Sequence, residues 1–461
     1  MRKKLLVIGA GPKAAAIAAK AVALEVAGYK VPEIIILEKN EIGANWSGRY
    51  GYTNGDQLLG TSPYKDLGFP YYSVFDNKVT FNMIQNFSWQ AFLSSEEKTV
   101  THFGEWVDRS NPQPTHKDWY GYLIWAIQRA KNDNIRIING TAKQIKLVDS
   151  KWKVNYSTIS RDKSQDISVD GIVITGPGDA NKIKNQPKHE RILDGKSFWQ
   201  NLYKFDRLYK FLSEENLEEP ICVIGSGETA ASIIAELVKR TDAKRPTPIQ
   251  VINPQGMIFS RGENYFENSV YTDPEGMIIW RKLPKKNREE IVKRTDRGVF
   301  STSSLETINN AQNVMPLYGR ISRIEISDFD DALFAVAVNE NKKEIFFPAS
   351  YIVIAIGFNP WSFVNLFDPE YQMLFEENRR INCGKNNPSI REVVVDNIKD
   401  DLTISWSVVS PGLDDENHPK FHVPMLAGIA QGPGFPNLSC LGSLSDRILK
   451  SYLPPNSLSA L

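Results

Sequence analysis

The chain has 461 residues, which is enough for two or three domains with well-buried cores. Hydrophobic residues make up 41% and charged residues 24%, and the net charge of +1 contains no long run of one sign, so neither a nucleic-acid surface nor an anionic-membrane surface is indicated. Three distant cysteines, Cys222, Cys383 and Cys440, form no C-x-x-C pair, which argues against a disulfide or metal role and favours a reducing compartment.

The N-terminus, MRKKLLVIGAG, imitates a signal peptide because basic residues precede apolar ones. Its apolar run, Leu5–Ile8, is too short for that role. No segment of the chain approaches the roughly 20 apolar residues that a membrane-spanning helix needs. We therefore expect a cytoplasmic protein.

A hydrophobic strand, a glycine-rich turn and a helix open the chain. In LLVIGAGPKAAAIA, Gly9, Gly11 and Ala14 fit the pattern G-x-G-x-x-G/A, and the helix runs on from Pro12. The first amides of such a helix can hold a pyrophosphate. The next strand ends at an acid, Glu38, 29 positions after Gly9. A carboxylate there accepts hydrogen bonds from a free ribose 2′-OH and repels a 2′-phosphate.

The following segment, 40–115, is rich in Gly, Asn, Pro and aromatic residues and is too long for a plain connection, so we expect it to be functional. A helix with a buried aromatic stripe is predicted over about 118–131. Residues 140–176 then predict paired strands and a hydrophobic strand that closes on Gly176.

A second copy of this pattern begins at ICVIGSGETAASII, where Gly225, Gly227 and Ala230 occupy the same places. Here the next strand ends at Asn253, 28 positions after Gly225, so no carboxylate stands at its end. Residues 319–357 repeat the paired strands and the strand closing on a glycine. Two matched units suggest two nucleotide sites, the first for FAD and the second for NADPH.

The duplication predicts an α/β fold with two Rossmann-like domains of the FAD/NAD(P)-binding type. We expect the NADPH-binding domain, 206–339, to be inserted into an FAD-binding domain made of 1–205 and 340–461. Residues 391–409 are predicted to form a hairpin with its turn near 396–401, and a glycine-rich loop then leads into a final helix. The substrate-binding segments are expected at 40–115 and 410–450.

FAD and NADPH together imply hydride transfer to the flavin. A disulfide reductase needs a paired cysteine, and no such pair is present. The five histidines show neither metal-ligand spacing nor a readable Ser-His-Asp arrangement. We therefore assign no catalytic protein residue and expect the flavin to carry the chemistry. Reaction of reduced flavin with O2 to give a C4a-hydroperoxide fits this situation.

Three stretches carry a resemblance to a known family: EIGANWSGRYGYTNGDQLLGTSPYKDLGFPYYS, GSGETAAS and MLAGIAQGPGFPNLSCLGSLSDRIL. Over essentially its whole length the chain resembles the flavin-dependent N-hydroxylating monooxygenases of siderophore biosynthesis, particularly the mycobactin-type lysine N6-hydroxylases. The resemblance implies hydroxylation of the side-chain amine of L-lysine with FAD, NADPH and O2, for siderophore or related hydroxamate biosynthesis. It also implies that NADP⁺ stays bound to protect the hydroperoxide.

The same resemblance suggests roles for individual residues. Lys65 matches a lysine that holds the amino-acid carboxylate of the substrate, and Asn268 matches an asparagine on the substrate or nicotinamide side. Ser445 is expected at the N-terminus of the last helix, where amides can face the flavin or the substrate. Ser260 and Arg261 are candidates for the 2′-phosphate. The residues expected to contact the cofactors are Gly9, Gly11, Ala14, Glu38, Lys39, Asn45, Trp46, Gly225, Gly227, Glu228, Thr229, Ser260, Arg261, Gly442 and Leu444.

Two departures leave the substrate amine open among lysine, ornithine, a diamine and an acylated lysine. Ornithine enzymes carry a glutamine where this chain has Gly60, and an asparagine within a segment that here is RGVFSTSS. A flavin monooxygenase acting on carbon or sulfur is an alternative, although its F-x-G-x-x-x-H pattern is degraded to Leu193, Gly195 and Trp199. A second alternative is an electron-transfer flavoprotein or a non-catalytic flavoprotein. The expected partners are a small amine and O2, with a homo-oligomer left open.

Overall fold

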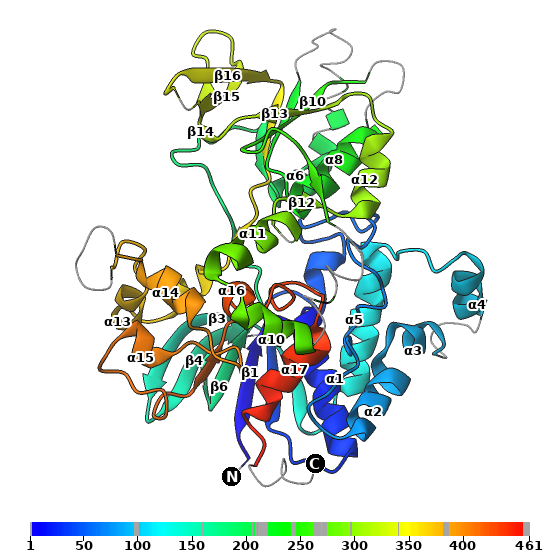
Figure 1. Ribbon diagram of the computed structural model, residues 1–461, viewed down its shortest axis with the longest axis vertical. Coiled ribbons are helices and arrows are strands. Elements are labelled where there is room, and N and C mark those ends of the chain that lie inside the picture. The colour runs from blue at the N-terminus through cyan, green and yellow to red at the C-terminus, as the bar shows by residue number, and fades with distance from the viewer. Residues whose placement is uncertain are drawn as a thin grey trace.

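Two sheets built around parallel strands, one above the other in Figure 1, form the framework of the protein. The computed structural model describes residues 2–95, 101–158, 161–204, 206–207, 210, 220–240, 246–261, 269, 274–295, 297–339, 341–380 and 387–454. The strands that the sequence pattern placed next to the glycine loops all belong to one or the other of these sheets. The predicted fold class, two Rossmann-like α/β units, is confirmed.

The lower sheet has seven strands in the order β19-β6-β1-β2-β3-β4-β5. Its neighbours from β19 to β3 pair in parallel, and β3, β4 and β5 continue it as an antiparallel meander. The strands are β1 (Lys4–Ile8), β2 (Glu33–Glu38), β3 (Ile135–Val148), β4 (Lys151–Thr158), β5 (Arg161–Val169), β6 (Gly171–Ile174) and β19 (Lys420–His422).

Helix α1 (Pro12–Val26) is the central helix of this lower unit, packed between α17 (Leu441–Lys450), α2 (Asn77–Phe87) and α5 (His116–Ala130) (Figure 1). Its alanine-rich sequence lets three helices approach closely, because small side chains leave little to separate the backbones. Helix α5 confirms the helix predicted over 118–131, and its residues Trp119, Tyr122 and Trp125 form the expected buried aromatic stripe.

The upper sheet has five strands, all paired in parallel, in the order β13-β10-β9-β17-β8. They are β8 (Ile192–Asp194), β9 (Ile221–Ile224), β10 (Ile249–Asn253), β13 (Val314–Tyr318) and β17 (Tyr351–Ile354). A three-stranded antiparallel sheet covers one face, made of β14 (Ile321–Ile326), β15 (Leu333–Val338) and β16 (Glu344–Ala349). Helices α6 (Ser197–Gln200), α8 (Glu228–Arg240) and α12 (Thr302–Asn309) lie on the other face.

The upper sheet is inserted between β6 and β19 of the lower one, but it is wider than the expected range 206–339. Its central strand β9 has parallel partners on both sides, and one of them, β17, comes after residue 339. The edge strand β8 comes before residue 206. The strand pairing therefore corrects the boundaries at both ends. Short strands β7 (Asp179–Ala180) and β18 (Phe358–Asn359) pair where the chain leaves and re-enters the lower unit.

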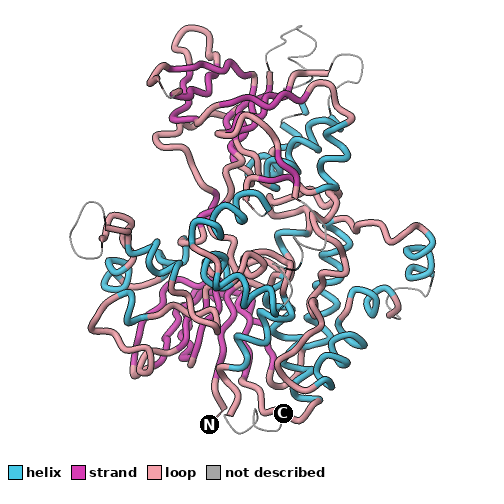
Figure 2. Tube along the Cα trace, in the orientation of Figure 1, coloured by secondary structure: helices cyan, strands magenta, loops and turns pink. Residues whose placement is uncertain are grey.

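The remaining elements are short. Strands β11 (Phe259–Ser260) and β12 (Val299–Phe300) form a small parallel pair in the upper unit. The helical elements are η1 (Ala44–Trp46), α3 (Trp89–Leu93), α4 (Thr101–Asp108), α10 (Pro274–Lys282), α11 (Lys285–Thr295), η2 (Ser362–Leu366), α13 (Pro369–Leu374), α14 (Ile390–Asp396), α15 (Trp406–Val409), η4 (Pro424–Leu426) and α16 (Gly428–Gln431). Figure 2 shows that the region between the two large sheets is mostly helices and loops, with only short strand segments among them.

Helices α10 and α11 belong by sequence to the inserted unit, yet they pack on α16 of the lower unit. The indole Nε1 of Trp280 donates to the carbonyl of Ile429 at 3.0 Å, and Arg288 donates to the same carbonyl at 2.7 Å. These contacts tie the inserted unit to the C-terminal glycine-rich loop.

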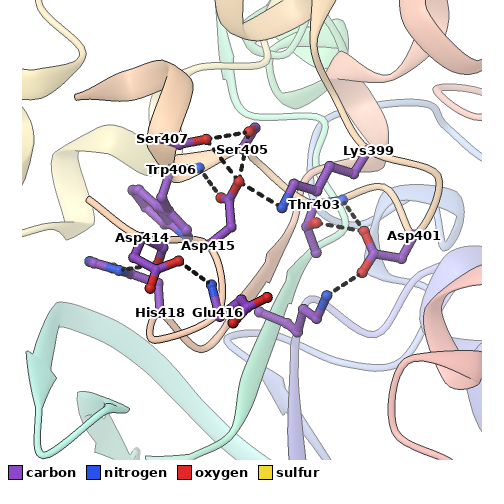
Figure 3. Close-up of polar contacts among 11 residues, drawn as sticks. Lys399, Asp401, Thr403, Ser405, Trp406, Ser407, Asp414, Asp415, Glu416 and His418 are labelled. Carbon is purple, nitrogen blue, oxygen red and sulfur yellow. Dashed lines mark hydrogen bonds and ion pairs between the residues drawn. The ribbon is translucent and has the colours of Figure 1, made fainter. Parts of the chain in front are cut away.

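The hairpin predicted over 391–409 is wrong, because this region forms helices α14 and α15. A capping box begins α14, in which the side chains of Ser389 and Glu392 each accept a hydrogen bond from the other's backbone amide. This helix-start signal outweighs the strand preference of the β-branched run that follows. At α15 the carboxylate of Asp415 accepts the Trp406 amide and the hydroxyls of Ser405 and Ser407 (Figure 3). No local sequence pattern announces that second cap.

Within the described residues, no helix combines the length and apolar character that crossing a membrane requires.

Candidate cofactor and substrate site

The first glycine loop leaves an open cradle at the start of α1. Gly9 has φ +102°, and a Cβ atom there would collide with the hydroxyl of Thr175. At Gly11 a Cβ atom would meet nothing within 4 Å, and no side chain caps the helix at this residue. Ala14 is fully buried. A helix start without a side-chain cap, with open space beside Gly11, fits a pyrophosphate.

Glu38 faces this cradle from the end of β2. Its carboxylate accepts the amide of Ala10 and the amide of Asn40, both at 2.8 Å, and the residue is half-buried. Two carboxylate oxygens have about four acceptor sites, so sites remain for ribose hydroxyls. Lys39, next to it, is exposed. The geometry therefore fits a nucleotide with a free ribose, as the sequence predicts for FAD.

The segment after β2 returns to the same loop. The amide of Gly43 donates to the carbonyl of Ala10 at 2.9 Å, which places half-buried Asn45 and Trp46 beside the cradle. The ring of Trp46 meets that of His116 edge-on, with centroids 4.8 Å apart. Burial lowers the pKa of His116 to about 4, so this imidazole is neutral at physiological pH.

Lys65 is buried, with only 6% of the residue exposed. The loop that carries it is held by its neighbour Asp66, whose carboxylate accepts the amide of Trp89 at 2.7 Å, the amide of Gly68 at 3.1 Å and the hydroxyl of Tyr71 at 2.7 Å. Burial raises the pKa of Asp66 to about 6, against the lowering effect of these donors. Sequence reasoning missed Asp66, although its place directly after Lys65 was a usable signal.

Helix α17 clamps this loop from the other side. The amide of Gly442 donates to the carbonyl of Phe69 at 2.8 Å, and a Cβ atom at Gly442 would collide with the carbonyl of Gly68. Asp446 forms a buried 2.6 Å ion pair with Lys20 of α1 and accepts the amide of Val74 at 3.1 Å. The loop around Lys65 is therefore fixed to α17, which is itself paired with α1, the helix that follows the first glycine loop.

One expectation about α17 changes in the structure. The helix begins at Leu441, so Ser445 lies in its second turn and not at its N-terminus, because Cys440 is the cap residue. The Ser445 hydroxyl donates to the carbonyl of Gly442 at 2.9 Å. Leu444 is fully buried and its amide donates to Cys440. For Gly442, Leu444 and Ser445 the visible role is packing, and ligand contact stays a prediction.

The second glycine loop resembles the first in that its first glycine also has a positive φ. Gly225 has φ +130° and lies against the carbonyl of Ala355, where a Cβ atom would collide. At Gly227 the nearest atom to a Cβ would be 3.8 Å away, so this position is again open. Thr229 is half-buried and contacts Gly195. The loop can therefore hold a second dinucleotide at the start of α8.

Asn253 ends β10 in the position that Glu38 occupies in the first unit. It is buried, and its Oδ1 accepts the amides of Gln255 and Gly256, each at 2.9 Å. These two hydrogen bonds set the orientation of the side-chain amide. The donor Nδ2 therefore points the other way, and it has no partner in the described part of the chain. A donor in place of a carboxylate fits a phosphorylated ribose.

The other residues predicted for this site are spread around the loop. Ser260 is exposed and Arg261 is half-buried, with its amide donating to the carbonyl of Phe300 at 2.8 Å. The charge of Arg261 lowers the pKa of Glu228, which burial raises more strongly. Asn268 lies outside the described residues.

Neither a metal site nor a thiol pair is present in the described part of the chain. Cys222 and Cys440 are free and buried, and burial raises the pKa of each thiol to about 12. Such thiols stay protonated and unreactive at neutral pH.

Comparisons with known proteins show the family of the chain. A family model described as L-lysine 6-monooxygenase/L-ornithine 5-monooxygenase matches residues 79–320. The L-lysine N6-monooxygenase MbtG of Mycolicibacterium paratuberculosis is 34% identical over 458 residues, covering 98% of this chain and 96% of that protein. MbtG of Mycobacterium tuberculosis is 34% identical over 454 residues, covering 97% and 95%.

A solved structure of the lysine monooxygenase NbtG from Nocardia farcinica has a TM-score of 0.75 and 33% identity, covering 97% of this chain and 99% of that one. The match extends over both units of the fold. The chain therefore belongs to the L-lysine 6-monooxygenase/L-ornithine 5-monooxygenase family.

Proposed function

We propose that this protein N-hydroxylates the side-chain amine of L-lysine, using FAD, NADPH and O2, for siderophore or related hydroxamate biosynthesis. The balanced reaction is R–NH2 + O2 + NADPH + H⁺ → R–NHOH + NADP⁺ + H2O. The observation that carries the choice of lysine is the full-length similarity, at 34% identity, to enzymes named L-lysine N6-monooxygenases.

FAD is assigned to the unit built on the seven-stranded sheet and NADPH to the unit built on the five-stranded sheet. Glu38 would hold the ribose of FAD, and the first-turn amides of α1 its pyrophosphate. The second glycine loop, with Asn253, Ser260 and Arg261 around it, would hold NADPH. Bound FAD, once reduced by NADPH, supplies the activated oxygen that is transferred to the amine.

The protein's own part is to hold the amino acid. Lys65 would pair with the substrate carboxylate, because a buried ammonium on a fixed loop is a strong, charge-assisted donor. Asp66 and Gly442 keep that loop in place. The side-chain amine must be neutral to act as a nucleophile, and its usual pKa is about 10.4. Turnover should therefore rise with pH toward the alkaline side.

The test is a substrate panel. Purified protein with FAD, NADPH and O2 is incubated with lysine, ornithine, cadaverine or an acylated lysine, and hydroxylamine is assayed separately from peroxide. We expect hydroxylamine with lysine in clear excess over the other amines. Peroxide alone across the panel, or no oxidation of NADPH, would contradict the proposal.

A cytoplasmic location stays a prediction that rests on the scattered cysteines.

A further inference from the structure

The segment that carries Lys65 lies directly against the inserted unit through a polar seam. Gln57 Nε2 donates to Glu236 of α8 at 3.2 Å, and the hydroxyl of Ser303, at the start of α12, donates to the carbonyl of Leu59 at 3.5 Å. All four residues are buried. The substrate segment is thus in hydrogen-bond contact with two helices of the unit assigned to NADPH.

Glu228 lies in this seam. Its Oε2 accepts the amide of Ser301 at 2.8 Å, and its Oε1 accepts the hydroxyl of Ser301 at 2.8 Å and that of Ser304 at 3.3 Å. Three donors and the N-terminus of α12 offset the cost of removing this carboxylate from water. The side chain is therefore held in one direction, toward Ser301.

Gly60 of the substrate segment lies next to the same carboxylate, with no room for a side chain between them. A Cβ atom at Gly60 would lie 2.8 Å from Oε1 of Glu228, 3.1 Å from its Cδ and 3.5 Å from the Cβ of Ser301. Since three hydrogen bonds fix the carboxylate, it cannot swing aside without losing partners. Any larger residue at position 60 must therefore displace Glu228 or move the segment.

The backbone of Glu228 belongs to the second glycine loop. It directly follows Gly227 and opens α8, the helix whose first amides would hold the dinucleotide. Its side chain reaches the segment on which Lys65 lies. One residue therefore contacts both the loop assigned to NADPH and the segment assigned to lysine.

We propose that Glu228 is a positioning residue that joins the second glycine loop to the substrate segment through Gly60, so that nucleotide and amino acid are aligned across one seam. This inference rests on the proposed function. Misalignment would let reduced flavin react with O2 without hydroxylating the amine, so peroxide would replace hydroxylamine as the product.

The test is a double-mutant cycle with Gly60→Ala, Glu228→Ala and the double variant, read as the fraction of NADPH electrons recovered in hydroxylamine. Each single change is expected to lower that fraction about five-fold, while FAD content stays near wild type. The double variant should be no worse than Glu228→Ala, because removing the carboxylate makes room for the methyl group.

Matched controls come from the same chain. Glu306 is an exposed glutamate on α12, and Gly412 has nothing within 4 Å of a Cβ position, so Glu306→Ala and Gly412→Ala should keep the wild-type fraction. If Glu228→Ala does not fold, Glu228→Gln preserves the size of the side chain and one acceptor, and a smaller loss of hydroxylamine is expected.

Two results would overturn the role of Glu228: single variants that match wild type, or losses that simply multiply in the double variant. A wild-type protein that makes no hydroxylamine from any amine would instead contradict the proposed function. The two failures are therefore distinguishable in the same assay.

Discussion

The two glycine loops share their glycine spacing and a positive φ at the first glycine, and they differ in where the nearby acid lies. In the first loop the acid, Glu38, ends the following strand and its carboxylate faces the loop through the amide of Ala10. In the second loop the strand ends in Asn253, and the acid, Glu228, opens the helix and faces Ser301 and Gly60. A carboxylate at the strand end is placed to contact a ribose, whereas one at the helix start is placed to contact the neighbouring unit.

The largest expected effect concerns substrate binding and involves neither glycine loop. Replacing Lys65 with Ala removes a buried cation, so the substrate carboxylate loses its partner at a cost of about 3 kcal/mol. We expect the KM for lysine to rise about 100-fold, which is that energy expressed as a ratio. NADPH oxidation without substrate, followed at 340 nm, should change little. An equal loss of both activities would contradict the carboxylate role.

The second-largest expected effect tests the role of the acid at the first loop. Glu38→Ala removes an acceptor for the ribose and also frees the amides of Ala10 and Asn40. Loss of hydrogen bonds to a charged group costs about 2 kcal/mol, so FAD should bind about 30-fold more weakly. Fluorescence titration of the apoprotein with FAD measures this. Unchanged FAD affinity, together with weaker NADPH binding, would mean that the two loops are assigned the wrong way round.

A smaller effect is expected when the second loop is given an acid in the position that Glu38 occupies at the first. Asn253→Asp keeps an oxygen to accept the amides of Gln255 and Gly256, but replaces the free Nδ2 donor with a carboxylate oxygen. The ratio of kcat/KM for NADPH to that for NADH should fall about ten-fold, because the new charge repels a 2′-phosphate. Asn253→Ala adds no charge and serves as the control. A ratio that falls equally in both variants would count against the charge effect.

The smallest effect is a pH dependence of stability at Glu228. Burial raises its pKa above the usual 4.5, so folding favours the protonated carboxyl. The stabilisation that comes from the protonated carboxyl of Glu228 is therefore fully present below pH 4.5. It is lost as the pH rises through the raised pKa. The free energy of unfolding of wild type, relative to Glu228→Gln, should therefore decline with pH above 4.5 and then level off. Urea unfolding across a pH series measures it, and a difference that grows with pH would be contrary to this expectation.

Both glycine units, the helix over 118–131 and the final helix were predictable, because each depends on a run of neighbouring residues. Helices α14 and α15 were not, since the β-branched run in the first favours a strand locally, and the second is capped by Asp415 from a later loop. Strand β8 also escaped prediction. Its short apolar run becomes part of the sheet only by pairing with β17, which lies far along the chain.

The sequence by itself determined the two nucleotide loops, the contrast between Glu38 and Asn253, and the resemblance that singled out Lys65. Each of these depends on residue identities at fixed spacing along the chain. Only the tertiary structure decided that Asp66 and Gly442 hold the Lys65 loop and that Glu228 meets Gly60. These contacts join residues distant in sequence, and packing of whole elements brings them together.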